Sequence, residues 1–221
     1  MTPGSDSPVH VRTMRASDLP FAARLHRACL PHGLFPALGE RFLGRYLFTY
    51  ATSPFGVALI VEADREPSGF LVGSFDDQAH RNHVVRHHGT SLAVRAGVAM
   101  LCRPPVAWRF LTTRLGRYAL GFTRRRLAPA RGVSTAMPEP SSAVLSHVAV
   151  APSARGAGAG TALVKAFVER VSATEARAAE LLTRDDELGA GRFYACLGWD
   201  QDGHLTDRDG LRWSKFRIDL D

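Results

Sequence analysis

One stretch of this chain, residues 144–171, limits the possible folds more than any other. It opens with an apolar, β-branched run at 144–150 that is typical of a buried strand, and a Pro-Ser turn and three glycines follow: Gly156, Gly158 and Gly160. Apolar residues then recur at helical spacing, at Leu163, Phe167, Val168 and Val171. The pattern predicts a strand, a glycine loop and a helix in direct succession.

Such a loop is suited to binding phosphate. The first N–H groups of a helix lack partners and carry the positive end of its dipole, and glycines let an anion approach them closely. Arg155 adds a positive charge, whereas the Lys-Ser/Thr pair of a P-loop is absent because Thr161 and Ala162 follow the last glycine. A dinucleotide fold is also a poor match, because it places its glycines early in a repeated βαβ pattern and this loop lies in the C-terminal half of the chain. The loop is predicted to hold a pyrophosphate; a glycine-rich turn without a ligand is the alternative.

Two motifs resemble those of a known family. Arg155, the spacing of Gly158 and Gly160, and the preceding Val-Ala-Val-Ala-Pro run resemble motif A of the GNAT superfamily of N-acetyltransferases. Residues 190–199, Ala-Gly-Arg-Phe-Tyr-Ala-Cys-Leu-Gly-Trp, are similar to its motif B, and the two occur in the family's order. The resemblance implies a mixed α/β fold, a central mixed sheet flanked by helices, and acetyl-CoA as acyl donor.

Length and composition favour a single domain. The 221 residues, 45% of them hydrophobic, suffice for one good core. The three cysteines are odd in number and widely spaced, which favours free thiols in a reducing compartment. The N-terminus lacks the basic and apolar regions of a signal peptide, and no apolar run approaches the roughly 18 residues of a membrane span. We expect a cytoplasmic protein with a flexible tail at 1–8 and one domain at 9–221.

The order of the other predicted elements agrees with the resemblance. A strand at 9–14 precedes two helices, which end before Pro31 and before Ser53, and a hairpin of strands at 57–63 and 70–75 follows. Beyond the glycine loop and its helix we expect a strand at 178–183, a helix from Asp185 to Gly198, and a closing strand at 211–220. An insertion at about 76–141 separates the third strand from the fourth.

That insertion is strongly basic. Residues 79–138 contain eleven arginines and no Asp, Glu or Lys, so this segment carries a charge of +11. Because the whole chain has a net charge of +7, the rest of it carries 7 − 11 = −4. Trp108, Leu111, Leu115, Tyr118 and Phe122 fall at helical spacing, which predicts a basic amphipathic helix. We expect the apolar face of this helix to pack on the domain's own core or in a homodimer interface. The alternative is that the helix contacts an acidic partner or an anionic membrane surface. Nucleic acid is not expected as a partner.

The insertion also carries a group of histidines. His80, His83, His87 and His88 have no cysteine or acid beside them in that stretch, so we interpret them as a solvated loop rather than a metal tract. We therefore expect no metal site.

Further roles follow from the resemblance. It implies that the fourth strand diverges from the fifth, so that backbone groups of Val148, Ala149 and Val150 bind the pantetheine arm. It places the pyrophosphate on the loop, at Arg155, Gly156, Ala157, Gly158, Ala159, Gly160 and Thr161. Tyr194 takes the position of the general acid, and a phenol with a pKa of about 10 is protonated at neutral pH.

The general base and the acceptor site are less defined by the sequence. His147 is either a base or a structural histidine, and strand alternation places it on the face of Ala149, opposite Ser146 and Val148. His32 and Phe35 lie in the segment that lines the acceptor site in the superfamily.

The sequence thus predicts an acetyl-CoA-dependent N-acetyltransferase that acts by direct transfer on a primary amine of a small molecule, such as an amino sugar or a natural-product amine. One alternative acceptor is a protein N-terminus or lysine. The other alternative is a non-catalytic acyl-CoA-binding or anionic-surface adaptor domain.

Overall fold

A computed structural model describes residues 9–32, 34–103, 142–185, 189–207 and 210–220. The tail predicted at 1–8 and the amphipathic helix predicted around Trp108 lie outside this part of the chain. The flexibility of the tail, the single-domain division and the role of the insertion therefore stay predictions.

The described residues form a mixed seven-stranded sheet in the order β1-β2-β3-β4-β5-β7-β6. Neighbouring strands are antiparallel except β4 and β5, which are parallel. The strands are β1 (His10–Thr13), β2 (Gly56–Ala63), β3 (Glu66–Ser74), β4 (Ala143–Val150), β5 (Ala178–Arg184), β6 (Asp200–Thr206) and β7 (Arg212–Asp219). The predicted fold class, a mixed α/β sheet flanked by helices, is confirmed.

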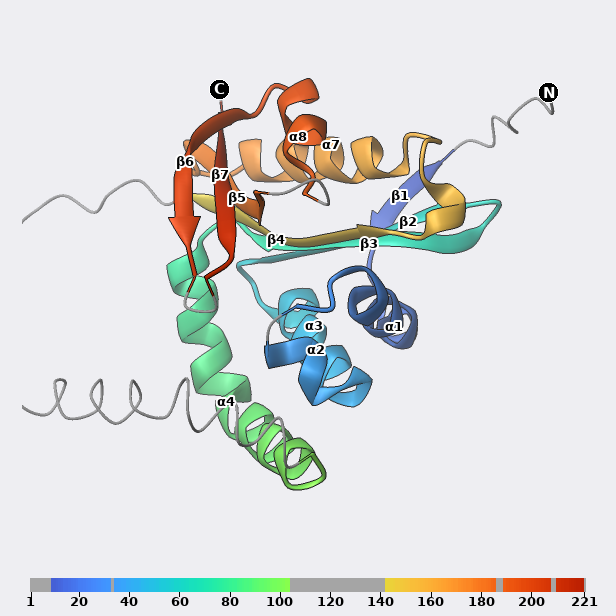
Figure 1. Cartoon of the computed structure of the whole chain (residues 1–221), viewed down its shortest axis with the longest axis vertical. Coiled ribbons are helices and arrows are strands. Elements are labelled where there is room, and N and C mark those ends of the chain that lie inside the picture. The colour runs from blue at the N-terminus through green and yellow to red at the C-terminus, as the bar shows by residue number, and fades with distance from the viewer. Residues whose placement is uncertain (1–8, 33, 104–141, 186–188, 208–209, 221) are drawn as a thin grey trace, which may run out of the picture.

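Helices cover both faces of the sheet (Figure 1). They are α1 (Leu19–Cys29), α2 (Leu34–Leu38), α3 (Glu40–Thr52), α4 (Asp77–Leu101), α7 (Ala159–Ser172) and α8 (Gly191–Cys196). In Figure 1, α7 and α8 lie above the sheet and α1, α2 and α3 lie below it, with α4 beside α2 and α3. Within the described residues, no helix has both the length and the apolar character needed to span a membrane.

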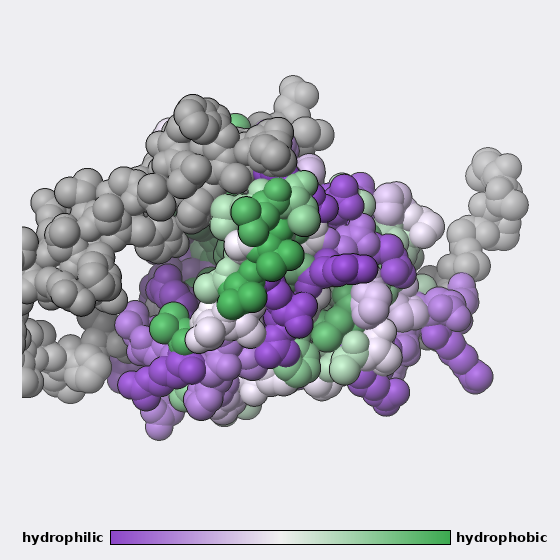
Figure 2. Space-filling model, turned by 90° about the horizontal axis from the view of Figure 1, so that it is seen from below, coloured by the Kyte–Doolittle hydropathy of each residue, from purple (hydrophilic) through white to green (hydrophobic). Residues whose placement is uncertain are grey.

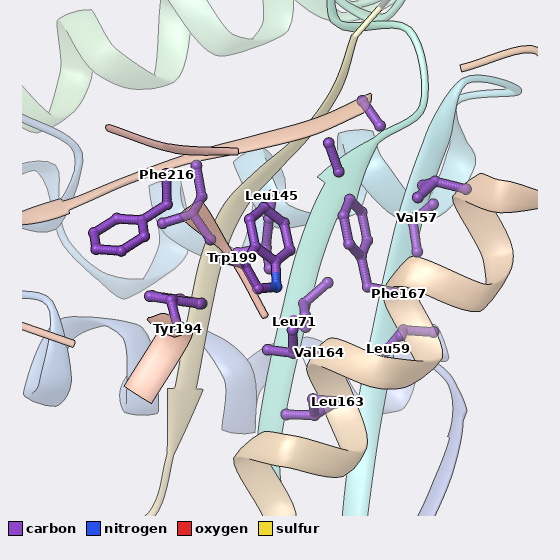
Figure 3. Packing of buried hydrophobic residues seen from close by; sticks show 14 of the residues in the cluster. Val57, Leu59, Leu71, Leu145, Leu163, Val164, Phe167, Tyr194, Trp199 and Phe216 are labelled. Atoms are coloured by element: carbon purple, nitrogen blue, oxygen red, sulfur yellow. The ribbon is translucent and has the colours of Figure 1, made fainter. Parts of the chain in front are cut away.

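Two apolar layers result from strand alternation. Leu59 and Leu71 face α7, and Figure 3 shows Leu163, Val164 and Phe167 projecting from that helix toward them. On the other face the neighbouring residues of β2 and β3 pack against α1 and α3, in a cluster that includes Leu25, Leu47, Ile60, Phe70 and Val72. The sheet is therefore buried on both sides at its centre.

The hairpin of β2 and β3 turns at Asp64 and Arg65, whose φ angles of 53° and 65° suit a tight two-residue connection. The second predicted helix is α3, and Gly39, which has φ 93°, separates it from the short helix α2. This conformation favours glycine and interrupts the helical backbone.

Two helix predictions need correction. The histidine-rich stretch is helical, not a loop: α4 continues through it from Asp77, and the carboxylate of Asp76 caps the helix by accepting from Ala79 N at 2.9 Å. The helix expected to open at Asp185 begins only at Gly191 as α8. Asp185 instead follows the end of the fifth strand, and its carboxylate pairs with Arg212 at 3.2 Å.

Strand β6 was not predicted from the sequence. All of its residues from Asp200 to Thr206 are exposed, so it carries no apolar alternation. It is held by pairing with β7 at the edge of the sheet.

Candidate active site

The strands β4 and β5 diverge in the middle of the sheet. They pair only near the start of β4, where Ala143 lies opposite Ala179 and Leu145 opposite Leu181. Beyond Leu145, β4 continues to Val150 with β3 as its only paired neighbour in the described sheet. A gap edged by unpaired backbone therefore opens between the two strands, as the resemblance implied.

Strand geometry decides which backbone groups face this gap. Ala151 N donates to Ser68 O at 2.8 Å, so Ala151 points toward β3. Because successive backbone groups point to opposite sides, Ala149 also points toward β3, whereas Val148 and Val150 point into the gap. The predicted contribution of Val148 and Val150 is compatible with this geometry, but the N–H of Ala149 belongs to the β3 ladder.

The glycine loop begins directly after the open part of β4. A short 3-10 turn (Pro152–Ala154) leads to Gly156 and Gly158, which have φ angles of 82° and 78°. Gly158 is the N-cap of α7, and Ala162 N donates the first helical hydrogen bond to its carbonyl at 2.9 Å. The N–H groups of Ala159, Gly160 and Thr161 thus precede the helical ladder, as anion binding requires.

The residues before this helix are accessible, since 155–158 are all exposed. Arg155 turns back over the end of β4: its Nε donates to Val150 O at 3.3 Å, and its Nη2 lies 3.6 Å from Cys29 Sγ. A charged guanidinium therefore lies beside both the loop and the gap. Cys29 was not predicted as a site residue, because nothing in the sequence connects α1 with the end of β4.

Phe193 is a second residue that the sequence did not single out for the site. A Cβ added to Gly160 would lie 3.3 Å from the ring of Phe193 and 3.7 Å from Val150. The absent side chain of Gly160 lets α8 pack against the start of α7. The second predicted motif is thereby placed next to the first.

Tyr194 lies in the apolar layer under α7. Its side chain is 4% exposed, and its ring lies 5.9 Å from Trp199 and 6.0 Å from Phe216. Burial raises the pKa of the Tyr194 phenol above its ordinary value of 10.0, so the hydroxyl is protonated at neutral pH. The raised pKa also makes it a weaker acid than an exposed tyrosine.

His147 lies on the other face of the sheet. Its Nε2 is 3.3 Å from Tyr46 Oη, and its ring meets that of His26 edge-on at 4.7 Å. Burial, and after it the charge of His26, lowers the pKa of His147 to about 3. The residue is neutral at pH 7 and a weak base, which fits a structural role better than proton abstraction.

A β-bulge changes the predicted alternation here. The register with β3 shifts between Val72 and Gly73, so one extra residue of β4 stands opposite them. Ser146, expected on the far side from His147, instead hydrogen-bonds to the Tyr50 hydroxyl on the α3 side. Leu145 remains in the opposite layer, against α7.

The two predicted acceptor residues have different neighbours. Nη1 of Arg184, at the end of β5, lies 2.7 Å from His32 Nε2, so the segment after α1 reaches across to the far side of the gap. Phe35 packs instead against Phe42 and Tyr46, with ring centroids 5.4 and 4.5 Å away. His32 is thus at the gap, and Phe35 supports α3.

Within the described ranges, no three or more His, Cys, Asp or Glu side chains are grouped so that they could hold a metal ion. Backbone N–H groups and one arginine are the features that the gap and the loop offer. They suit an elongated anionic ligand with a thioester or amide-like arm.

We compared the sequence and the structure with those of known proteins. Residues 127–220 match the family model described as "Acetyltransferase (GNAT) domain". No curated protein matches the chain.

Solved structures similar to this chain include several acetyltransferases. The spermidine/spermine N-acetyltransferase of Vibrio cholerae is 12% identical, with 98% of this chain and 95% of that one covered at a TM-score of 0.56. An aminoglycoside 6′-acetyltransferase type Ii is 14% identical, with coverages of 96% and 97% and a TM-score of 0.55. The ribosomal-protein-S18-alanine N-acetyltransferase of Escherichia coli is 11% identical, with coverages of 96% and 94% and a TM-score of 0.53. At these identities the likeness is one of fold.

Proposed function

We propose that this chain, whose residues 127–220 match the GNAT acetyltransferase domain, transfers the acetyl group of acetyl-CoA directly to the primary amine of a small molecule. The observation that carries the proposal is the gap between β4 and β5, into which the backbone groups of Val148 and Val150 point. Bound there, acetyl-CoA would supply an activated thioester. The chain's part is to hold that thioester, position the amine and manage the protons.

The loop residues would hold the phosphates of the donor. The N–H groups of Ala159, Gly160 and Thr161 are free of helical partners, and Arg155 provides a charge-assisted donor. Gly156 and Gly158 keep the backbone accessible because both have a positive φ that favours glycine. Ala157 is exposed between them.

The gap would place the reacting carbonyl. The N–H groups of Val148 and Val150 are fixed by the strand and need no reorganisation to donate to an oxygen that gains negative charge. Tyr194 is the proposed proton donor to the departing thiolate, since its buried phenol is protonated at neutral pH. The low pKa of His147 directs proton removal from the amine to water instead.

The acceptor is proposed from the charge around His32. Between residues 30 and 52 the chain has one acid, Glu40, and its carboxylate pairs with Arg27 at 3.2 Å. On the other side of the gap Arg184 contributes a positive charge. This balance disfavours a polycationic acceptor and supports a small amine with a neutral or anionic body.

Activity is tested by incubating the protein with acetyl-CoA and a panel of amines and measuring released thiol. The panel contains amino sugars, aromatic amines, polyamines, and peptides with a free N-terminus or lysine. Turnover of a small amine at the highest kcat/KM is expected. Preference for a peptide would support a protein acceptor instead, and coenzyme binding without turnover of any amine would support a non-catalytic domain.

Coenzyme binding is tested separately with a matched pair at the N-cap of α7. Gly158→Asp places a negative charge beside the proposed pyrophosphate, whereas Gly158→Asn has nearly the same shape without the charge. Like charges at about 4 Å cost roughly 1 to 4 kcal/mol, so the Asp variant should bind acetyl-CoA at least about tenfold more weakly than the Asn variant. Equal affinities in calorimetry would refute the loop assignment.

A further inference from the structure

A second cavity lies away from the proposed active site. Its volume is about 560 Å³, and it is formed by residues before and within α1, by α3, and by Arg95 of α4. These helices belong to the layer below the sheet in Figure 1, whereas α7, at whose start the glycine loop lies, is above it. Figure 2 views the molecule from this lower side, where hydrophilic side chains border a hydrophobic band. The volume is in the range of small-molecule sites.

The lining of this cavity is strongly basic. Arg24, Arg41, Arg45 and Arg95 face a single carboxylate, that of Glu40. Glu40 is already paired with Arg27. Among the described residues, Arg24, Arg41 and Arg95 have no hydrogen-bond or ion-pair partner. Four like charges around one cavity repel one another, and a bound anion would relieve that repulsion.

Arg45 is the most enclosed of the four. Its guanidinium carbon lies 4.9 Å from the centre of the Phe48 ring, and its Nη2 donates to His88 Nδ1 at 3.3 Å. Burial, followed by the charge of Arg45, lowers the pKa of His88, so that this imidazole can accept as a neutral group. Nε of Arg45 is buried and has no acceptor within the part of the chain described. A guanidinium held by two neighbours and still lacking an acceptor is suited to an anion.

The remaining lining is apolar. Leu19, Pro20, Ala23 and Phe48 form part of the wall. We propose that the cavity binds a small organic phosphate, with the phosphoryl group on the arginines and its apolar body against these side chains. The planar fork of arginine matches phosphate oxygens in a bidentate way, which an ammonium does not. Such a ligand would join α1, α3 and α4 from outside the acetyl-transfer site.

The probe is phenyl phosphate, measured by calorimetry on protein saturated with coenzyme A, so that the glycine loop is not free to bind it. Sub-millimolar binding that weakens with added salt is expected, with phenol as the uncharged control. Arg41→Glu and Arg95→Glu should each weaken binding at least tenfold. Arg170→Glu, the same charge change on α7, should leave it within twofold.

Two outcomes would overturn the proposal: wild-type protein that does not bind phenyl phosphate, or equal losses in Arg41→Glu and Arg170→Glu. Each variant is first checked for native circular dichroism, and Arg41→Gln provides a milder change should reversal of charge unfold the chain. Lipid vesicles test whether the phosphate comes from a lipid headgroup or from a free small molecule. Binding to phosphatidic acid vesicles that phenyl phosphate displaces assigns the cavity to a lipid headgroup, and vesicle binding that it does not displace contradicts the proposal.

Discussion

Acidification should destabilise this protein well above the pH at which carboxylates titrate, because two buried histidines and one partly buried histidine are uncharged in the folded state. His26 and His80 are 2% and 3% exposed, and burial lowers the pKa of each to about 4. The pKa of His147 is lowered to about 3. In the unfolded chain all three return to 6.5, so the unfolded state binds more protons between these values and stability falls as pH falls below 6.5.

The size of the effect follows from the linkage relation. At pH 8 the three side chains are neutral in both states, whereas at pH 5 they are protonated almost only in the unfolded chain. Each then costs about 1.5 pK units, or about 2 kcal/mol, and the three together cost about 6 kcal/mol. A typical domain has only about 5 to 15 kcal/mol. The lowered pKa of Asp18, caused first by its hydrogen bonds from Arg12, confines its own contribution to lower pH.

Urea unfolding at pH 8 and pH 5, followed by circular dichroism, measures this difference. His80→Phe should keep the stacking on Tyr50, at 4.3 Å, and should reduce the loss between the two pH values to about 4 kcal/mol. His10→Gln removes an exposed imidazole and should leave the full loss. A wild-type loss below about 1 kcal/mol, or the same loss in His80→Phe as in His10→Gln, would refute the reasoning.

Two further predictions concern the gap and its proposed proton donor. Tyr194→Phe keeps the ring among Trp199 and Phe216 but removes the hydroxyl, so kcat should fall by about 10² while acetyl-CoA affinity in calorimetry stays near wild type; unchanged turnover would make the residue structural. Val148→Pro removes an N–H that points into the gap, so the variant should stay folded and lose turnover. Ala149→Pro removes an N–H that is hydrogen-bonded in the β3 ladder, so this variant should have a lower unfolding midpoint. Equal stability losses in the two proline variants would contradict the backbone orientation.

The sequence predicts the parts of this fold that carry a strong local signal. The strand, glycine loop and helix from Ala143 to Ser172 combine β-branched residues, positive-φ glycines and helical periodicity, and all three are in place. Strand β6 could not be found in this way, because an exposed edge strand lacks alternation and depends on its neighbour for pairing. The start of α8 was predicted wrongly for a related reason. An acidic residue such as Asp185 is compatible with a helix start, but it is equally compatible with an ion pair at the end of a strand, which is the role that it has here.

The residues of the candidate site also differ in whether a local sequence signal could reveal them. Backbone features of the loop and of β4 are local, so their residues could be named from the sequence. The contacts of His32 with Arg184 and of Arg155 with Cys29 join segments that are distant in the chain, and no spacing rule connects them. The bulge beside His147 has a similar origin, since it is defined by the register with β3 rather than by β4 alone.

The pairing of β3 with β4 has a consequence for how this chain can be divided. The segment that resembles other proteins in sequence, 127–220, contains β4 but not β3, its antiparallel partner from Gly69 to Ser74. Expressed alone, that segment would present β4 as a bare edge with a row of unsatisfied peptide groups, a template for pairing with other chains. The segment that matches in sequence is therefore smaller than the unit that folds. A polypeptide trimmed to residues 127–220 should aggregate, and supplying residues 1–103 as a second polypeptide should restore its solubility.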